Sequence, residues 1–292
     1  MTRFRLIAAA PLLLLLPAGA SASQHWDHSF PAGKHPKVVI TGSDAHIRVH
    51  AATGTTVEAS VTAKGQTVGI YFQSRKPEVS FDQKGEVIEI VARSGGEERK
   101  SGTGIMITWL TLVVDVTVPP GCDLEIENDD GPVQVSGIEG RVEVRNSDGD
   151  VHLSDLRGDI RVRTSDGPVV AENLDGRLQG HTADGTMRVS GRFDELDLES
   201  QDGRLTVDIQ PGSQIREAWN LTTQDGGLDL GIPGALKATL DARVEDGGMR
   251  IDLPKVEVGD SHPSGVRIDL NGGGPVLRVR SADGSVRIRT HS

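Results

Sequence analysis

The sequence predicts an all-β protein, a parallel β-solenoid of about nine 18-residue, two-strand coils with an N-terminal β-rich cap. The main observation is a unit that recurs between residues 124 and 289, with an Asp-Gly pair between two short apolar runs. A fixed period of this kind is the signature of a repeat array. The eight copies read LEIENDDGPVQV, VEVRNSDGDVHL, IRVRTSDGPVVA, LQGHTADGTMRV, LDLESQDGRLTV, WNLTTQDGGLDL, LDARVEDGGMRI and LRVRSADGSVRI.

The second observation is alternation within each unit. Val142 and Val144 precede one Asp-Gly pair, Val151 and Leu153 follow it, and polar residues separate them. A period of two indicates strands with one buried face, and Asp-Gly supplies the positive φ angles of a tight turn. The aspartates of the eight turns are Asp130, Asp148, Asp166, Asp184, Asp202, Asp225, Asp246 and Asp283.

The spacing of the units is regular at first and then changes. The first five aspartates follow one another at intervals of 18 residues, whereas 37 residues separate the last two. We expect a degenerate unit around residues 262–270 to fill that gap. An antiparallel meander fits the alternation as well, but its one-faced strands would need a cover that no helical pattern supplies. A solenoid covers the face by folding the sheet onto itself.

The third observation is a small polar residue two positions before most of the turn aspartates. Such a ladder makes sense if these residues lie directly above one another, which favours the solenoid over a meander, sandwich or barrel. Val244 is the exception. The polar members are Asn128, Asn146, Thr164, Thr182, Ser200, Thr223 and Ser281.

The chain begins with features of a secretory signal peptide in residues 1–22: arginines, an apolar run and the cleavage pattern Ala-Ser-Ala. The run is too short to span a bilayer, so we expect an exported protein, periplasmic or extracellular, with no transmembrane segment after cleavage. Residues 23–37 contain His25, His28 and His35. A flexible N-terminus is favoured there over a metal site.

Residues 38–121 contain β-rich runs without the period and are expected to cap the array, with residues 105–118 as a long buried strand. The polar segment 94–104 is the candidate loop. Residues 122–292 form the solenoid. Its last unit ends near Arg289, which would leave an open C-terminal edge and a candidate site of self-association.

The sequence contains few candidates for catalytic or ligand-binding residues. It holds no G-x-S-x-G, H-E-x-x-H or P-loop motif, so we expect no enzyme and no cofactor, and no catalytic, cofactor-binding or metal-ligating residue is singled out. The only cysteine, Cys122, is expected to be a buried, inert thiol. His46, Arg48 and His50 indicate a solvated strand face. The turn aspartates could bind calcium, but the favoured interpretation is that they stabilise the backbone of the turns.

The charge of −11 argues against a nucleic-acid partner. Two groups of outward arginines could still meet an anionic polymer, although pairing with neighbouring carboxylates is favoured. The first is formed by Arg145, Arg161 and Arg163, and the second by Arg278, Arg280, Arg287 and Arg289.

The run VDVTVPPGCDLEIENDDGPVQVSGIEGRVEVRNSDGDVHLSDLRGDIRVRTSDGPV (114–169) resembles a bacterial β-strand-repeat family known as putative adhesins of unknown function. The resemblance covers roughly residues 100–292 and implies a β-helix-like envelope or exported protein, without functional residues to transfer. We therefore expect a non-enzymatic, structural or adhesin-like protein that binds an envelope polysaccharide or protein through its solenoid faces. A polysaccharide-binding or polysaccharide-active β-helix and an envelope-stress signalling partner are the alternatives.

Overall fold

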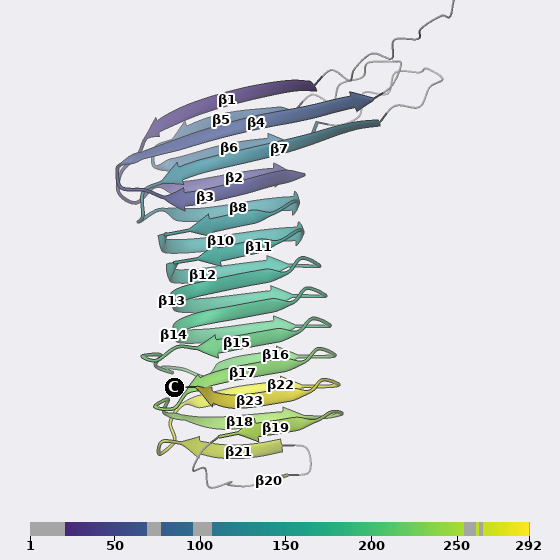
Figure 1. Ribbon diagram of the computed structural model, residues 1–292. Coiled ribbons are helices and arrows are strands. Elements are labelled where there is room, and N and C mark those ends of the chain that lie inside the picture. The colour runs from purple at the N-terminus through teal and green to yellow at the C-terminus, as the bar shows by residue number, and fades with distance from the viewer. Residues whose placement is uncertain (1–20, 69–76, 96–106, 254–260, 263–264, 292) are drawn as a thin grey trace, which may run out of the picture.

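The computed structural model describes residues 21–68, 77–95, 107–253, 261–262 and 265–291. These residues form strands and no helix, and all the strands join into one continuous sheet. The sheet turns back on itself at each repeat, so that two layers face each other along a tall stack (Figure 1). The expected all-β, solenoid-like fold is confirmed.

The strands of adjacent repeats are parallel and in register at the period of the sequence. Val142 lies between Leu124 on one side and Ile160 on the other. An antiparallel meander is therefore excluded for these repeats. Each coil places one strand before its turn and one after it, and we call the two layers the pre-turn face and the post-turn face.

The pre-turn face contains β2 (Lys37–Ser43), β8 (Asp123–Asp130), β10 (Glu139–Asp148), β12 (Arg157–Thr164), the second halves of β13 (Val169–Thr182) and β14 (Met187–Ser200), β16 (Trp219–Thr223), β22 (Val276–Ser281) and β18 (Ala238–Val244). The post-turn face contains β3 (Ala45–Ala51), β9 (Val133–Ser136), β11 (Val151–Ser154), the first halves of β13 and β14, β15 (Leu205–Ile209), β17 (Leu228–Pro233), β23 (Val286–His291) and β19 (Met249–Asp252).

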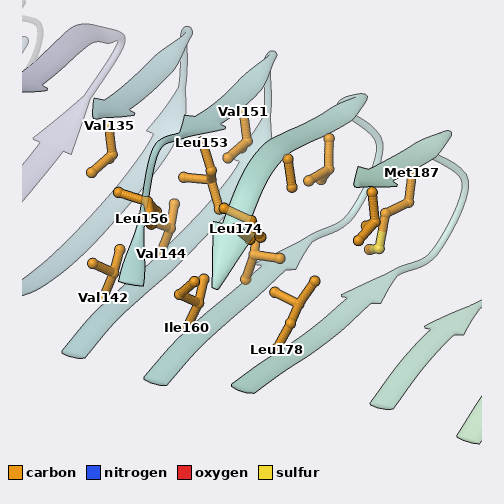
Figure 2. Close-up of a cluster of buried hydrophobic side chains, with 14 of the residues drawn as sticks. Val135, Val142, Val144, Val151, Leu153, Leu156, Ile160, Leu174, Leu178 and Met187 are labelled. Atoms are coloured by element: carbon orange, nitrogen blue, oxygen red, sulfur yellow. The ribbon is translucent and has the colours of Figure 1, made fainter. Parts of the chain in front are cut away.

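The core lies between the two faces. Figure 2 shows Val142 and Val144 from the pre-turn strand β10 and Val151 and Leu153 from the post-turn strand β11 among the buried side chains, and all four are at most 1% exposed. Trp219 is completely buried, as its place in the repeat predicts, and its indole N–H donates a hydrogen bond to the Asp194 carbonyl oxygen. Alternation thus places every second side chain in the core.

The array begins earlier than residue 122. Strands β2 and β3 already form a coil, because they pair in parallel with β8 and β9, which lie much later in the chain (Lys37 pairs with Asp123, and Ile47 with Val133). The cap is therefore smaller than residues 38–121. It consists of β1 (Ser21–Pro31), β4 (Thr56–Val68), β5 (Glu78–Lys84), β6 (Val87–Arg93) and β7 (Ile107–Val118).

The expected flexible N-terminus, residues 23–37, is wrong for most of its length. Strand β1 pairs antiparallel with β4 along all of its residues, and Phe30 is 3% exposed. Backbone pairing and burial of an aromatic ring order this segment. The expected long strand is confirmed as β7, while residues 1–20 of the predicted signal peptide and most of the polar loop 94–104 lie outside the described residues.

The C-terminal coil does not end the array. Strand β22 pairs in parallel with β16 on one side and β18 on the other, and β23 pairs likewise with β17 and β19. The yellow pair β22 and β23 accordingly lies between the two green coils in Figure 1. The expected open edge after Arg289 is thus wrong. The expected degenerate coil at residues 262–270 is also wrong, since β20 (Ser261–His262) and β21 (Gly265–Leu270) pair antiparallel.

Candidate functional site

The Asp-Gly turns form one edge of the stack. The sequence predicted glycine there for its positive φ angle, and among the eight turns this holds for Gly131 (105°) and Gly149 (114°). Close stacking explains glycine in every turn. A Cβ atom on Gly203, for example, would lie closer than 3.0 Å to the carbonyl oxygen of Gly185, and each of the other turn glycines has the same conflict with the carbonyl of a neighbouring coil.

The predicted polar ladder is confirmed beside these turns. Its members are buried and lie side by side from Asn128 to Ser281. They bond to the turn backbone: the Thr223 hydroxyl donates to the Gly226 carbonyl oxygen, and the Gly284 amide donates to the Ser281 hydroxyl. Buried polar groups need such partners, so the ladder holds the turns together.

The eight turn aspartates are exposed and point away from the core along the same edge. In register, Asp130 lies beside Asp148. Within the described ranges, no group of three or more His, Cys, Asp or Glu side chains is arranged to hold a metal ion. The predicted N-terminal histidines are dispersed as well: His25 contacts Asp27, His28 stacks on Phe81, and His35 bonds the Gly121 carbonyl oxygen.

The pre-turn face carries a hollow of about 340 Å³ over strands β10 to β14. The predicted arginine group lines it: Arg145, Arg161 and Arg163 lie on neighbouring strands. The other lining side chains are Glu143, Val144, Val162, Gln179, His181, Asp197 and Glu199, together with Gly180.

Most charges in this pre-turn hollow are paired, as the sequence favoured. Arg145 contacts Glu143, and Arg161 lies 3.2 Å from Asp159. Arg163 is exposed and makes no ion pair within the part of the chain that the structure describes. Asp197 has no cationic partner there either, and burial, together with the charge of Glu199, raises the pKa of its carboxyl. Among the described residues, the hollow therefore holds one cation and one carboxyl without an ion-pair partner.

The second predicted arginine group is divided between the two faces. Arg278 and Arg280 lie on β22 in the pre-turn face, whereas Arg287 and Arg289 lie on β23 in the post-turn face. Arg280 contacts Asp241 at 3.1 Å and Arg289 contacts Asp229 at 3.3 Å. These four arginines are close in sequence but do not form the single surface patch that the sequence predicted.

The structure adds two arginines that the sequence did not single out. Arg204 and Arg250 join Arg287 around a second hollow of about 340 Å³ on the post-turn face, with Val286 and Met249 in its lining. The sequence contains one signal for this hollow, the extra glycine of the Asp-Gly-Gly units at Gly227 and Gly248. A glycine has no side chain, so it leaves space on the surface next to the turn.

At the opposite end of the post-turn face, the predicted outward row of β3 is confirmed. His46, Arg48 and His50 are exposed. Arg48 forms an ion pair with Asp115 at 2.6 Å, and His50 lies 3.0 Å from the Thr117 hydroxyl. These contacts join the first coil to the cap.

Cys122 is completely buried. Burial raises the pKa of its thiol to about 12, and the Sγ atom lies 3.3 Å from the Asp123 carbonyl oxygen. A protonated, buried sulfur is a poor nucleophile.

The fold defines the class of protein: it is an all-β repeat protein with a packed interior and outer faces that are exposed to solvent. The chain belongs to the Toastrack DUF4097 family, whose model matches residues 35–289. None of the curated proteins matches it. Within the described residues, no helix has the length and apolarity needed to cross a membrane.

The solved structures that are similar to this chain include three putative adhesins. A putative adhesin from Parabacteroides distasonis is 13% identical, with 91% of this chain and 97% of that chain covered and a TM-score of 0.45. One from Parabacteroides merdae is 12% identical, with 91% and 95% covered and a TM-score of 0.43. One from Bacteroides fragilis is 9% identical, with 92% and 97% covered and a TM-score of 0.36.

Proposed function

We propose that this protein is exported and acts as a non-enzymatic, adhesin-like module of the cell envelope that binds a polymer or protein through its solenoid faces. The observation that supports the proposal is the pre-turn hollow. Its floor consists of paired strands, and its rim carries Arg163 and Asp197, neither of which has an ion-pair partner among the described residues. Fixed, preorganised groups lose little entropy on binding.

Repetition explains how such a face would recognise a polymer. Outward side chains recur at the strand spacing of ~4.8 Å, and the interior behind them is filled by buried aliphatic residues. A ligand that repeats along its own length can therefore contact several coils in the same way. The signal-like residues 1–22 and the single cysteine support an exported location without disulfides.

The test is retention of the purified full chain on envelope fractions, isolated cell-wall sacculi and acidic polysaccharides, each at low and high salt. Retention on one fraction, lost in the double variant Arg163→Gln/Asp197→Asn, is the expected result. The matched control is Arg177→Gln/Asp194→Asn, which changes the same charges outside the hollow. Absence of retention on every fraction, or turnover of a polysaccharide by the purified protein, would contradict the proposal.

A further inference from the structure

The intercalated C-terminal coil assembles a surface that no single repeat contains. The residue directly after each Asp-Gly pair lies in a row along the turn edge, and in three adjacent coils it is small: Gly227, Ser285 and Gly248. Their adjacency is fixed by backbone hydrogen bonds, since the Leu228 amide donates to the Ser285 carbonyl oxygen at 2.9 Å and the Val286 amide donates to the Gly248 carbonyl oxygen at 2.8 Å. The same row holds larger side chains in the other coils: Pro132, Asp150, Pro168, Thr186 and Arg204.

The post-turn hollow lies beside these three small residues. Its floor is apolar, because Leu228 and Val286 are buried and Met249 is half-buried. It forms only because Ser285 lies between the two glycines, and this order in space requires β23 to insert between β17 and β19.

Four guanidinium groups follow the hollow along the axis of the stack, and we call them the basic stripe: Arg188, Arg204, Arg287 and Arg250. All four are exposed. Of these, Arg250 bonds to Asp252 on its own strand, while the other three form no ion pair among the described residues.

Among the described residues, Asp229 is the one carboxylate that lines the hollow, while Asp252 pairs with Arg250 beside it. Asp229 is next to Arg287 in register, but its charge is offset by Arg289 at 3.3 Å. The row of turn aspartates flanks the hollow on the edge side, so an anion has access to the guanidinium groups from the open face rather than across the turns. On a chain with a formal charge of −11, such a local excess of cations is not explained by composition.

The spacing indicates what kind of anion fits. The stripe runs from Arg188 on β14, past β15, β17 and β23, to Arg250 on β19, a span of roughly 19 Å at ~4.8 Å per strand. Arg204 lies directly before β15, and β17 contributes no arginine. One pyranose ring is about as long as one such interval. Among the described residues, the lining of the hollow contains no aromatic side chain, whereas single-stranded nucleic acids are usually held by stacking on such rings. A polymer of acidic sugars matches both the spacing and the lining.

We propose that the basic stripe binds an acidic polysaccharide along the axis of the solenoid, with carboxylates on Arg204, Arg287 and Arg250 and a sugar ring in the post-turn hollow. This inference rests on the proposed binding function and names a ligand class and a site for it. Carboxylates accept charge-assisted hydrogen bonds from arginine in a bidentate geometry.

The first test measures binding of polygalacturonate to the full chain at low salt, with neutral dextran as the uncharged probe. We expect polygalacturonate alone to bind, and Arg204→Gln/Arg287→Gln to weaken binding at least about tenfold. The control Arg177→Gln/Arg278→Gln removes the same charge from the pre-turn face, outside both hollows, and should leave the affinity unchanged. Equal losses in both double variants would overturn the site, because they would indicate a general charge effect.

The second test closes the hollow without changing charge. A Cβ atom on Gly248 would meet no atom within 4 Å, and one on Gly227 would make an ordinary contact at 3.6 Å. We expect Gly227→Thr/Gly248→Thr to fold as the parent does and to lose polygalacturonate binding, whereas Gly234→Thr, at another open position, keeps it. Undiminished binding by the filled variant would overturn the role of the hollow.

Two further outcomes separate this inference from the proposed function. If inorganic polyphosphate or single-stranded DNA binds as tightly and with the same sensitivity to the variants, the stripe is a general anion site and the assignment to polysaccharide is wrong. If polygalacturonate fails to bind while the chain is still retained on an envelope fraction, the inference fails and the proposed function stands.

Discussion

The turn glycines have no room for a side chain between neighbouring coils. We expect Gly203→Ala to destabilise the protein by about 1–3 kcal/mol, because its Cβ atom would overlap the Gly185 carbonyl oxygen. The matched control is Gly248→Ala, whose Cβ atom has open space and whose effect should stay below about 1 kcal/mol. Denaturation by urea, followed by circular dichroism, measures both. Similar stabilities for the two variants would show that neighbouring turns do not need close contact.

The buried thiol supplies a second prediction at the residue scale. With the pKa of Cys122 raised to about 12 by burial, iodoacetamide should leave the folded protein unmodified at pH 8 and label it quickly in urea. The raised pKa of Cys122 also makes the free energy of unfolding depend on pH. This free energy is unaffected below the ordinary thiol pKa of about 9 and falls as the pH rises above it, because the thiol then ionises in the unfolded chain but not in the folded one. Labelling of the native protein at a rate independent of urea would contradict this account.

Several residue-scale features could be predicted from the sequence. The polar ladder and the alternation that places Trp219 in the core depend only on position within the unit. The reason for the turn glycines could not be predicted fully, because the distance from Gly203 to Gly185 is a property of stacking between coils. The same holds for Arg204 and Arg250, which lie in different repeats and meet Arg287 only when the coils are stacked.

At the scale of elements, the C-terminal coil should stabilise two neighbours rather than one. Deletion of residues 276–292 removes four core side chains, Leu277, Val279, Val286 and Ile288. It also removes the hydrogen-bond partners of coils on both sides. We therefore expect loss of amide-exchange protection in β16 and β17 as well as in β18 and β19.

The control deletes nothing from the backbone. The variant Leu277→Ala/Ile288→Ala keeps the coil but weakens its packing, which should cost at most about 2–5 kcal/mol of stability per truncated side chain. Amide-exchange protection should therefore fall in the coils on both sides, but less than in the deletion variant. Loss of protection confined to β18 and β19 would contradict the intercalated order, because a terminal coil has one neighbour.

The position of this coil could not be predicted from local pattern. Each repeat presents the same apolar face and the same turn, so any unit fits any slot in the stack, and chain order was the only guide to spatial order. One clue was present. Val244 interrupts the polar ladder, and in the structure its coil is the last parallel one, where the ladder ends beside Ser281. The sequence did not identify β2 and β3 as a coil of the array, because the turn between them lacks the Asp-Gly pair by which the repeats were recognised.

At the scale of the molecule, stacking has an electrostatic consequence. The eight turn aspartates recur along one edge at ~4.8 Å, where solvated like charges repel by up to about 1 kcal/mol per pair. We expect the melting temperature to rise with NaCl, because added ions screen this repulsion. Asp166→Asn/Asp202→Asn should raise the melting temperature at low salt and reduce its dependence on salt. The control Asp27→Asn/Asp82→Asn removes two carboxylates from the cap strands β1 and β5, away from the Asp-Gly turns.

The same experiment distinguishes a structural edge from a calcium-binding one. If the aspartates serve the turns, EDTA should leave the melting temperature unchanged, and CaCl₂ should act only as NaCl does at equal ionic strength. Calcium ligation requires several oxygen atoms around one ion and would stabilise the native state by mass action. A rise in melting temperature at micromolar calcium, abolished in Asp166→Asn/Asp202→Asn, would therefore assign the edge as an ion-binding row and would contradict the prediction that the repeated charge is a cost of stacking.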